Sequence, residues 1–204
     1  MAKLKHYGKV SAGLALGKIT LNDKPNPGDI QLLRPQDLHT NILLGKETLA
    51  PLDYLALEEG LRSRIKTEHY LRENDIVLTA RGTSFHVAMI ETLAPNQHII
   101  MSNNMLCLRP DIEHPHAITI YLNSDDFKDN VIAKEFPKML GLSVRWLNEV
   151  VFSLPAAHKR AAFADLLKSY QTQIDAIETY RQAFQTRMEA ALFDHLNQLE
   201  KDND

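Results

Sequence analysis

Residues 71–90 read LRENDIVLTARGTSFHVAMI and set the fold class of the chain. The polar turn Glu73-Asn74-Asp75 leads into a β-branched run that ends near residue 80, and a second apolar run, FHVAMI, begins at Phe85. The polar loop Arg81-Gly82-Thr83-Ser84 separates the two runs. Short apolar runs that are bounded by turn residues are typical of buried β-strands. The stretch therefore predicts two short strands joined by a polar loop.

The neighbouring segments extend this pattern. Residues 99–108 read IIMSNNMLCL and predict two more strand pieces, broken by Ser102-Asn103-Asn104. Residues 116–122, HAITIYL, form either a strand or the start of a helix. Residues 125–140 and 143–149 predict helices separated by Gly141. Short strands and helices in this mixture predict an α+β domain with a mixed sheet, which we assign to residues 1–153.

The last part of the chain differs in composition, because it contains no Pro and no Gly between residues 157 and 200. Apolar side chains recur there every three or four residues, at Phe163, Leu167, Tyr170, Ile174, Ile177, Phe184 and Met188. This spacing predicts a coiled-coil seam along one helix of about 65 Å, with polar interruptions at Arg181 and His195. The alternative is a pair of ordinary helices that pack back on the domain. We assign residues 154–204 to one long helix that pairs with a second copy of the chain.

The composition excludes several classes of protein. The formal net charge of −3 excludes a histone-like basic binder, although residues 1–66 carry ten Lys and Arg against seven Asp and Glu. That excess makes the N-terminal third the favoured face for a polyanion. A single cysteine, Cys107, excludes a disulfide framework and a four-cysteine zinc site. Without a signal-peptide pattern or an apolar run long enough for a membrane span, we expect a cytoplasmic protein.

No motif for catalysis, metal or cofactor binding is present. The sequence lacks the patterns GxxxxGK[ST], GxGxxG and HExxH. His114-Pro115-His116 offers two imidazoles, but no neighbouring residue completes a metal site. Cys107 lies in the apolar run MLCL, where cysteine is usually an inert core residue. We therefore predict no catalytic residue, no metal and no cofactor.

Two polar loops carry side chains suited to recognition. The loop at Arg81 offers a guanidinium and hydroxyls that can donate to phosphates and base edges, and Ser102-Asn103-Asn104 offers amides that can pair with adenine. The alternative is a pair of tight turns whose polar groups satisfy their own backbone. With lysines added from the N-terminal third, the candidate nucleic-acid contacts are Lys18, Lys24, Thr79, Arg81, Thr83, Ser84, His86, Asn103 and Asn104.

Four stretches together resemble the DNA-specificity subunits of type I restriction-modification systems. Residues 6–18, HYGKVSAGLALGK, are similar to that family's opening segment, with Lys9 in place of the usual aspartate. Residues 71–90 resemble its L-x-x-G-D-I-L core, with Asn74 in place of glycine, and residues 101–110, MSNNMLCLRP, resemble its SN…RP strand. Residues 147–163 resemble the start of its conserved helix, where Ala157-His158 replaces Glu-Gln.

The resemblance implies a non-catalytic protein with one target-recognition domain followed by one spacer helix, half of a full specificity subunit. Such a chain would read one half-site in double-stranded DNA. It would dock a methyltransferase (modification) subunit and, through it, an endonuclease subunit. S-adenosylmethionine would then bind the modification subunit and not this chain. A two-fold homodimer would restore two recognition domains and would read a palindromic, interrupted site. We expect its helices to be antiparallel, because a parallel pair would bring Arg181 against Arg181.

Two other hypotheses remain open from the residues alone. The first is a coiled-coil adaptor whose α+β head binds another protein. The second is a small enzyme that uses Cys107 and a histidine. Salt-dependent DNA binding distinguishes the first from a DNA-recognition protein, and the reactivity of the Cys107 thiol tests the second.

Overall fold

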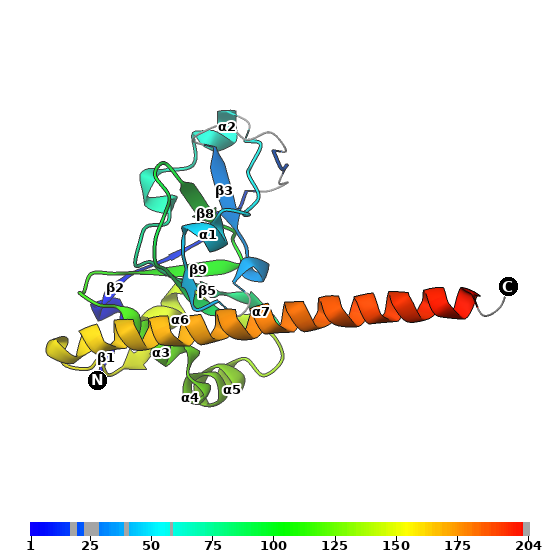
Figure 1. Ribbon diagram of the computed structural model, residues 1–204. Coiled ribbons are helices and arrows are strands. Elements are labelled where there is room, and N and C mark those ends of the chain that lie inside the picture. Colours follow the sequence, from blue (N-terminus) through cyan, green and yellow to red (C-terminus); the bar gives the residue numbers. More distant parts are fainter. Residues whose placement is uncertain (17–19, 23–28, 39–40, 58, 202–204) are drawn as a thin grey trace. The chain divides into compact units, whose positions relative to one another are not determined.

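The computed structural model describes residues 1–16, 20–22, 29–38, 41–57 and 59–201 (Figure 1). The chain divides into two compact units, Met1–Leu167 and Lys168–Asp204. The division lies inside the last helix, so the first turns of that helix belong to the first unit. The proposed functional boundary at 153/154 stays a prediction. In the part of the chain that is described, no helix has the length and apolar character needed to cross a membrane.

A five-stranded sheet forms the centre of the first unit. Its strands lie in the order β2 (Gly8–Ala12), β9 (Met105–Pro110), β5 (Ile76–Thr79), β7 (Val87–Ile90) and β4 (Leu43–Leu44). The first four pair antiparallel and β4 pairs parallel to β7, so the predicted mixed sheet is confirmed. Strands β5 and β7 are buried at every residue, which explains their continuous apolar sequence.

Apolar clusters cover both faces of this sheet. Because side chains alternate along a strand, Ile76 and Leu78 join one cluster and Val77 joins the other. The first cluster includes residues of the helices α3 (His116–Asn123) and α6 (Val144–Glu149). The second includes residues of β3 (Ile30–Leu33), β8 (His98–Met101) and α1 (Lys46–Leu49). The core therefore lies on both sides of the central sheet.

Three two-stranded pairs surround the central sheet. Strand β3 runs parallel to β8, while β1 (Ala2–Lys3) pairs antiparallel with β11 (Val151–Phe152). The third pair joins β6 (Arg81–Gly82) to β10 (Leu140–Gly141), also antiparallel. Short helical turns complete the unit: η1 (Leu4–His6), η2 (Pro35–Asp37), α2 (Glu59–Arg62) and η3 (Thr67–His69).

The helices after residue 115 differ in part from the prediction. Residues 116–122, which the sequence left open, belong to helix α3. The helix expected over 125–140 is a run of α4 (Asp125–Phe127), a π-helical turn η4 (Lys128–Ile132) and α5 (Ala133–Glu135). It ends at Glu135 because Pro137 disfavours a helical conformation at Phe136, where φ is −126° and ψ is 64°. The expected end at residue 140 was therefore wrong.

The chain ends in one long helix, α7 (Ala157–Lys201), which Figure 1 draws from yellow to red. The structure thus confirms the α+β class with a long C-terminal helix, and the alternative of two separate helices is wrong. Leu167, which the heptad pattern places in a seam, is 1% exposed and packs in the core of the first unit. This residue is therefore not available to a partner helix.

Candidate nucleic-acid interface

Three of the four sequence stretches that carry the family resemblance are neighbouring strands. They contribute β2, β9 and β5, which lie side by side in that order. Two glycines of the first stretch are required by this packing. A Cβ atom on Gly8 would lie 2.2 Å from the carbonyl oxygen of Arg109, and one on Gly13 would lie 1.9 Å from that of Ser102. These stretches therefore build the framework of the unit.

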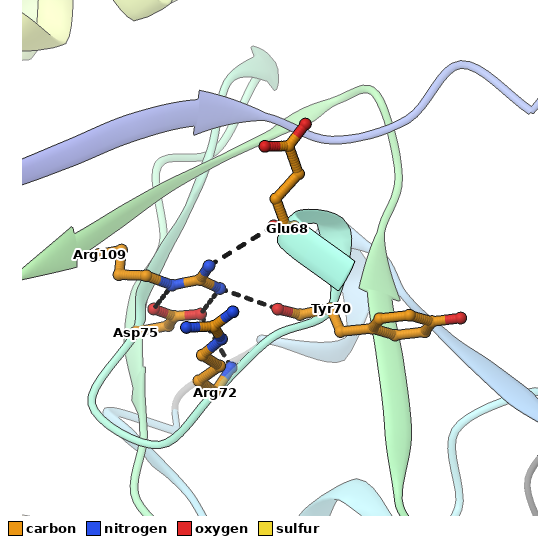
Figure 2. A network of polar contacts seen from close by, with 5 residues as sticks. All are labelled: Glu68, Tyr70, Arg72, Asp75 and Arg109. Atoms are coloured by element: carbon orange, nitrogen blue, oxygen red, sulfur yellow. Dashed lines mark hydrogen bonds and ion pairs between the residues drawn. The ribbon is translucent and has the colours of Figure 1, made fainter. Parts of the chain in front are cut away.

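An ion pair between two of these stretches fixes the start of β5 (Figure 2). Arg109 donates from Nε to Oδ1 of Asp75 over 2.8 Å and from Nη2 to Oδ2 over 2.6 Å. The same guanidinium donates to the carbonyl oxygen of Tyr70 over 2.8 Å. Asp75 also accepts from the backbone N–H of Arg72 over 2.8 Å. The hydrogen bond to Asp75 raises the pKa of the Arg109 guanidinium, so the guanidinium remains charged.

The turn before β5 explains a departure from the family pattern. Asn74 has φ of 70°, in the left-handed region that favours glycine. Asparagine tolerates this region better than other residues with a side chain. The sequence therefore keeps the turn with Asn74 where the family pattern has glycine.

The Arg81 loop follows the other end of β5 and is braced from inside by Thr79. The Thr79 hydroxyl donates to the carbonyl oxygen of Ser84 and accepts from the N–H of His86, both over 2.9 Å. Thr79 is 1% exposed. The structure does not support the predicted DNA contact at this residue, because its hydroxyl is enclosed by the loop that it supports.

The structure brings the two polar loops together. The carbonyl oxygen of Asn104 accepts from the N–H of Ala80 over 2.7 Å and from that of Arg81 over 3.3 Å. At this junction the side chains of Arg81, Thr83, Ser84, Asn103 and Asn104 are exposed, while His86 is half-buried. Ser102 itself is buried and hydrogen-bonded through its backbone to Leu33 and Met105. Five of the predicted contacts therefore share one exposed junction.

Ion pairs involve many of the basic residues in the N-terminal third, residues 1–66. Lys18 and Lys24, two predicted contacts, lie outside the described residues. Several other basic residues of this third face acids: Lys3 and Lys5 bind Glu149, and lower the pKa of its carboxyl to about 2. Further ion pairs are Lys9–Glu68, Arg34–Asp53 and Arg62–Asp29. Most of the basic side chains described in this third therefore have acidic partners, and the excess does not by itself mark a face for a polyanion.

Sequence reasoning missed one segment beside the junction. Strand β10 (Leu140–Gly141) lies against β6, and the N–H of Leu142 donates to the carbonyl oxygen of Ala80 over 3.0 Å. The sequence predicts a helix up to residue 140, which includes Leu140 of this strand. Pro137 was the signal that could have indicated the change of structure.

Cys107 lies in β9 with its side chain buried in the core. Burial raises the pKa of its thiol well above the ordinary value, and the charge of Asp75 adds to the rise. A nucleophilic cysteine needs the opposite shift. Within the described ranges, no group of three or more His, Cys, Asp or Glu residues is placed to hold a metal ion.

Several predicted seam residues are exposed in the second unit. Ile177 is 66% exposed, and Tyr170, Phe184 and Met188 are exposed as well. Ile174 and, in the first unit, Phe163 are half-buried. Arg181 donates to Glu178 of its own helix over 2.8 Å. Because its charge is already compensated within the chain, Arg181 no longer decides between a parallel and an antiparallel pair.

Comparison with solved structures identifies the fold. A chain of a type I R-M system aligns with a TM-score of 0.60 and 13% identity over 86% of this chain. The HsdS subunit from Thermoanaerobacter tengcongensis aligns with a TM-score of 0.58 and 13% identity over 87% of this chain. The chain has the fold of a part of an HsdS subunit. Comparisons of the sequence with protein-family models and with curated proteins find no match.

The likeness to HsdS confirms the sequence resemblance at the level of the fold. The chain spans 39% of the type I R-M chain and 38% of the HsdS subunit. A third similar structure is the type IIG restriction endonuclease BpuSI, with a TM-score of 0.57 and 10% identity over 81% of this chain and 26% of that one. The chain therefore spans well under half the length of each of these three proteins.

Proposed function

We propose that the chain recognises a DNA sequence and has no catalytic activity of its own. The observation that carries this proposal is the junction at Asn104, where the Arg81 loop and the Asn103–Asn104 turn are held together and exposed. Within the described residues, Arg81 makes no ion pair, in contrast to the lysines of β1 and η1, which share Glu149. Its charge is therefore available to a ligand.

The chemistry of the junction fits double-stranded DNA. An arginine guanidinium can donate two hydrogen bonds to guanine, and an asparagine amide can pair with adenine in the major groove. The hydroxyls of Thr83 and Ser84 can donate to phosphate oxygens, which position a protein without reading sequence. We assign base reading to Arg81, Asn103 and Asn104. His86, half-buried beside the loop, serves as a further contact at its rim.

The partners follow from the likeness to HsdS. In this proposal the chain docks a methyltransferase subunit and, through it, an endonuclease subunit of a restriction-modification system in the cytoplasm. The methyltransferase binds S-adenosylmethionine, and this chain binds no cofactor. The support is the HsdS fold together with a helix that continues beyond the first unit.

A second copy of the chain covers the exposed apolar residues of α7. Tyr170, Ile177 and Phe184 repeat every seven residues, and Met188 extends the stripe by one turn. Leu167 does not belong to this seam because it is committed to the core of the first unit. The two-fold axis of such a homodimer relates the two recognition units, so that the dimer reads an interrupted palindrome. We keep the antiparallel orientation as part of this proposal. Apolar stripes of this kind are avoided on soluble monomers.

Fluorescence anisotropy with a labelled mixed-sequence duplex tests DNA binding by the full chain. The logarithm of the association constant should fall linearly with the logarithm of the salt concentration. The reason is that lysines and arginines of the protein, on binding phosphates, release counterions from the duplex. A folded chain that shows no binding at about 50 mM salt would contradict the proposal. That result would favour the adaptor hypothesis, which uses the same helix stripe but requires no DNA.

The variant Arg81→Ala gives the residue-level readout. On a duplex that the chain prefers, loss of a bidentate contact to guanine should cost about 1–3 kcal/mol and relax the preference. The matched control is Arg64→Ala, an exposed arginine between α2 and η3. Equal affinity and equal preference in wild type and Arg81→Ala would make the loop merely structural.

A further inference from the structure

The segment Lys138–Gly141 ends in strand β10, which pairs with the first two residues of the Arg81 loop. In the antiparallel pair of β6 with β10, Arg81 lies opposite Gly141 and Gly82 lies opposite Leu140. The hydrogen bond from Leu142 N–H to the carbonyl oxygen of Ala80 extends this pairing by one step. The loop is thus held on one side by Asn104 and on the other by this segment.

The backbone of the loop is open above Gly82. Its φ of 125° lies in a region that residues with a side chain rarely adopt. A Cβ atom built there would meet no described atom within 4 Å. Glycine is therefore required at position 82 by its backbone conformation and not by lack of space for a side chain. The open space leaves the strand pair accessible to a ligand from that side.

Core packing anchors the segment. Leu140 and Leu142 are buried in the main core cluster, while Gly141 between them is exposed. The ring of Phe136 passes 3.8 Å from the position of a Cβ atom on Gly141. Phe136 in turn meets the edge of Trp146, with ring centroids 5.2 Å apart. Such support fixes a recognition element better than a free loop does.

Two side chains just before this anchored part extend to solvent. Met139 is 65% exposed, more than the other exposed large apolar side chains described between Ala2 and Leu167. Lys138 is exposed and, within the described residues, forms no ion pair. An unpaired cation and an exposed apolar side chain therefore lie two residues and one residue before β10, the strand that pairs with Arg81 and Gly82. Methionine is flexible and polarisable, which suits an adaptable contact surface.

We propose that Lys138 and Met139 form a third part of the DNA-reading surface, with Lys138 on a phosphate and Met139 on the 5-methyl group of a thymine. This inference rests on the proposed function. The charges favour DNA over a protein partner, because neither Arg81 in β6 nor Lys138, two residues before β10, forms an ion pair within the described residues. The thymine methyl is the apolar group that a base pair presents in the major groove.

The Lys138 contact is tested with the full chain and a mixed-sequence duplex. Lys138→Ala should weaken binding several-fold on every duplex and reduce the salt slope by about one unit. The matched control is Lys159→Ala, an exposed lysine in the first turn of α7 that should leave the slope unchanged. A slope that Lys138→Ala leaves unchanged would overturn this contact.

The Met139 contact is tested on the duplex that the wild-type chain enriches from a randomised library, prepared once with thymine and once with deoxyuridine. Wild type should bind the thymine duplex about threefold to tenfold more tightly, as expected for one apolar contact to a base. Met139→Ala should lose this difference, whereas the control Leu166→Ala, another exposed apolar residue, should keep it. Equal wild-type affinity for the two duplexes would overturn the contact.

The intrinsic fluorescence of Trp146 separates the failure of this inference from the failure of the proposed function. Trp146 is the single tryptophan, and its ring packs against Phe136, which in turn lies next to Gly141 of the segment. DNA binding should change its emission in wild type. One outcome would overturn the contacts of Lys138 and Met139 alone. In that outcome, DNA binding depends on Arg81, neither Lys138→Ala nor Met139→Ala changes it, and the Trp146 emission stays constant. Absence of any DNA binding by the folded chain would overturn both proposals.

Discussion

Arg109 donates two parallel hydrogen bonds to Asp75, from Nε to Oδ1 over 2.8 Å and from Nη2 to Oδ2 over 2.6 Å. Asp75 is 1% exposed, and Arg109 is its ion-pair partner. The pair joins the end of β9 to the turn before β5, and the Arg81 loop follows the opposite end of β5. The two motif residues therefore stabilise the framework that presents the loop and do not themselves contact DNA in this account.

The first prediction concerns this ion pair. Asp75→Asn should lower the free energy of unfolding by about 3 kcal/mol, because it leaves a partly buried guanidinium without its counterion. Urea denaturation followed by circular dichroism measures the loss. Glu178→Gln, which breaks the exposed pair with Arg181, is the control and should cost less than about 1 kcal/mol. A change below about 1 kcal/mol for Asp75→Asn would show that the pair does not stabilise the framework.

The second prediction concerns the left-handed turn at Asn74. Asn74→Gly should leave the stability unchanged or raise it slightly, because glycine adopts the observed φ of 70° without strain. Asn74→Ala should lower the free energy of unfolding by about 1 kcal/mol. The same urea titration measures both variants. If alanine were tolerated as well as glycine, the backbone conformation at this turn would not explain the family preference.

The third prediction concerns Cys107. Iodoacetamide should modify the folded chain very slowly at neutral pH, because the thiol is buried and its pKa is raised. The urea-unfolded chain is the control and should react quickly. Mass spectrometry of timed samples gives both rates. Rapid modification of the folded chain would revive the hypothesis of a cysteine nucleophile.

The fourth prediction concerns the α7 stripe. Ile177→Asp should convert a dimer into a monomer, because a charge would enter the apolar seam. Sedimentation equilibrium at tens of micromolar measures the mass, and circular dichroism checks that the fold is retained. Gln173→Asp places the same charge at an exposed residue outside the heptad seam and should remain dimeric. A monomeric wild type at these concentrations would refute self-association through this helix.

Local sequence patterns predicted much of the fold. Turn residues around two apolar runs indicated β5 and β7, and the absence of Pro and Gly indicated the long helix. Two misses have one cause: a pattern does not show what a segment packs against. Leu167 fits the heptad repeat but is buried in the first unit, and Thr79 resembles a loop contact but braces the loop from within.

The candidate site depended on tertiary pairing that spacing does not reveal. The two polar loops were each visible in the sequence, but their junction is made by Asn104 and Ala80, which lie 24 positions apart in the numbering. The segment at Lys138–Gly141 is more distant still and was hidden by a helix prediction that Pro137 should have ended. Net charge along the chain was a weak guide, because ion pairs neutralise several N-terminal lysines and arginines.

Sequence-specific DNA recognition is the central claim, and selection from a randomised duplex library measures it most directly. The purified full chain is mixed with the library at moderate salt, and the bound duplexes are amplified and sequenced over several rounds. Our account predicts that wild type enriches an interrupted inverted repeat and that Arg81→Ala loses a defined base preference within each half-site. Bound duplexes with the same sequence distribution as the starting library would contradict it.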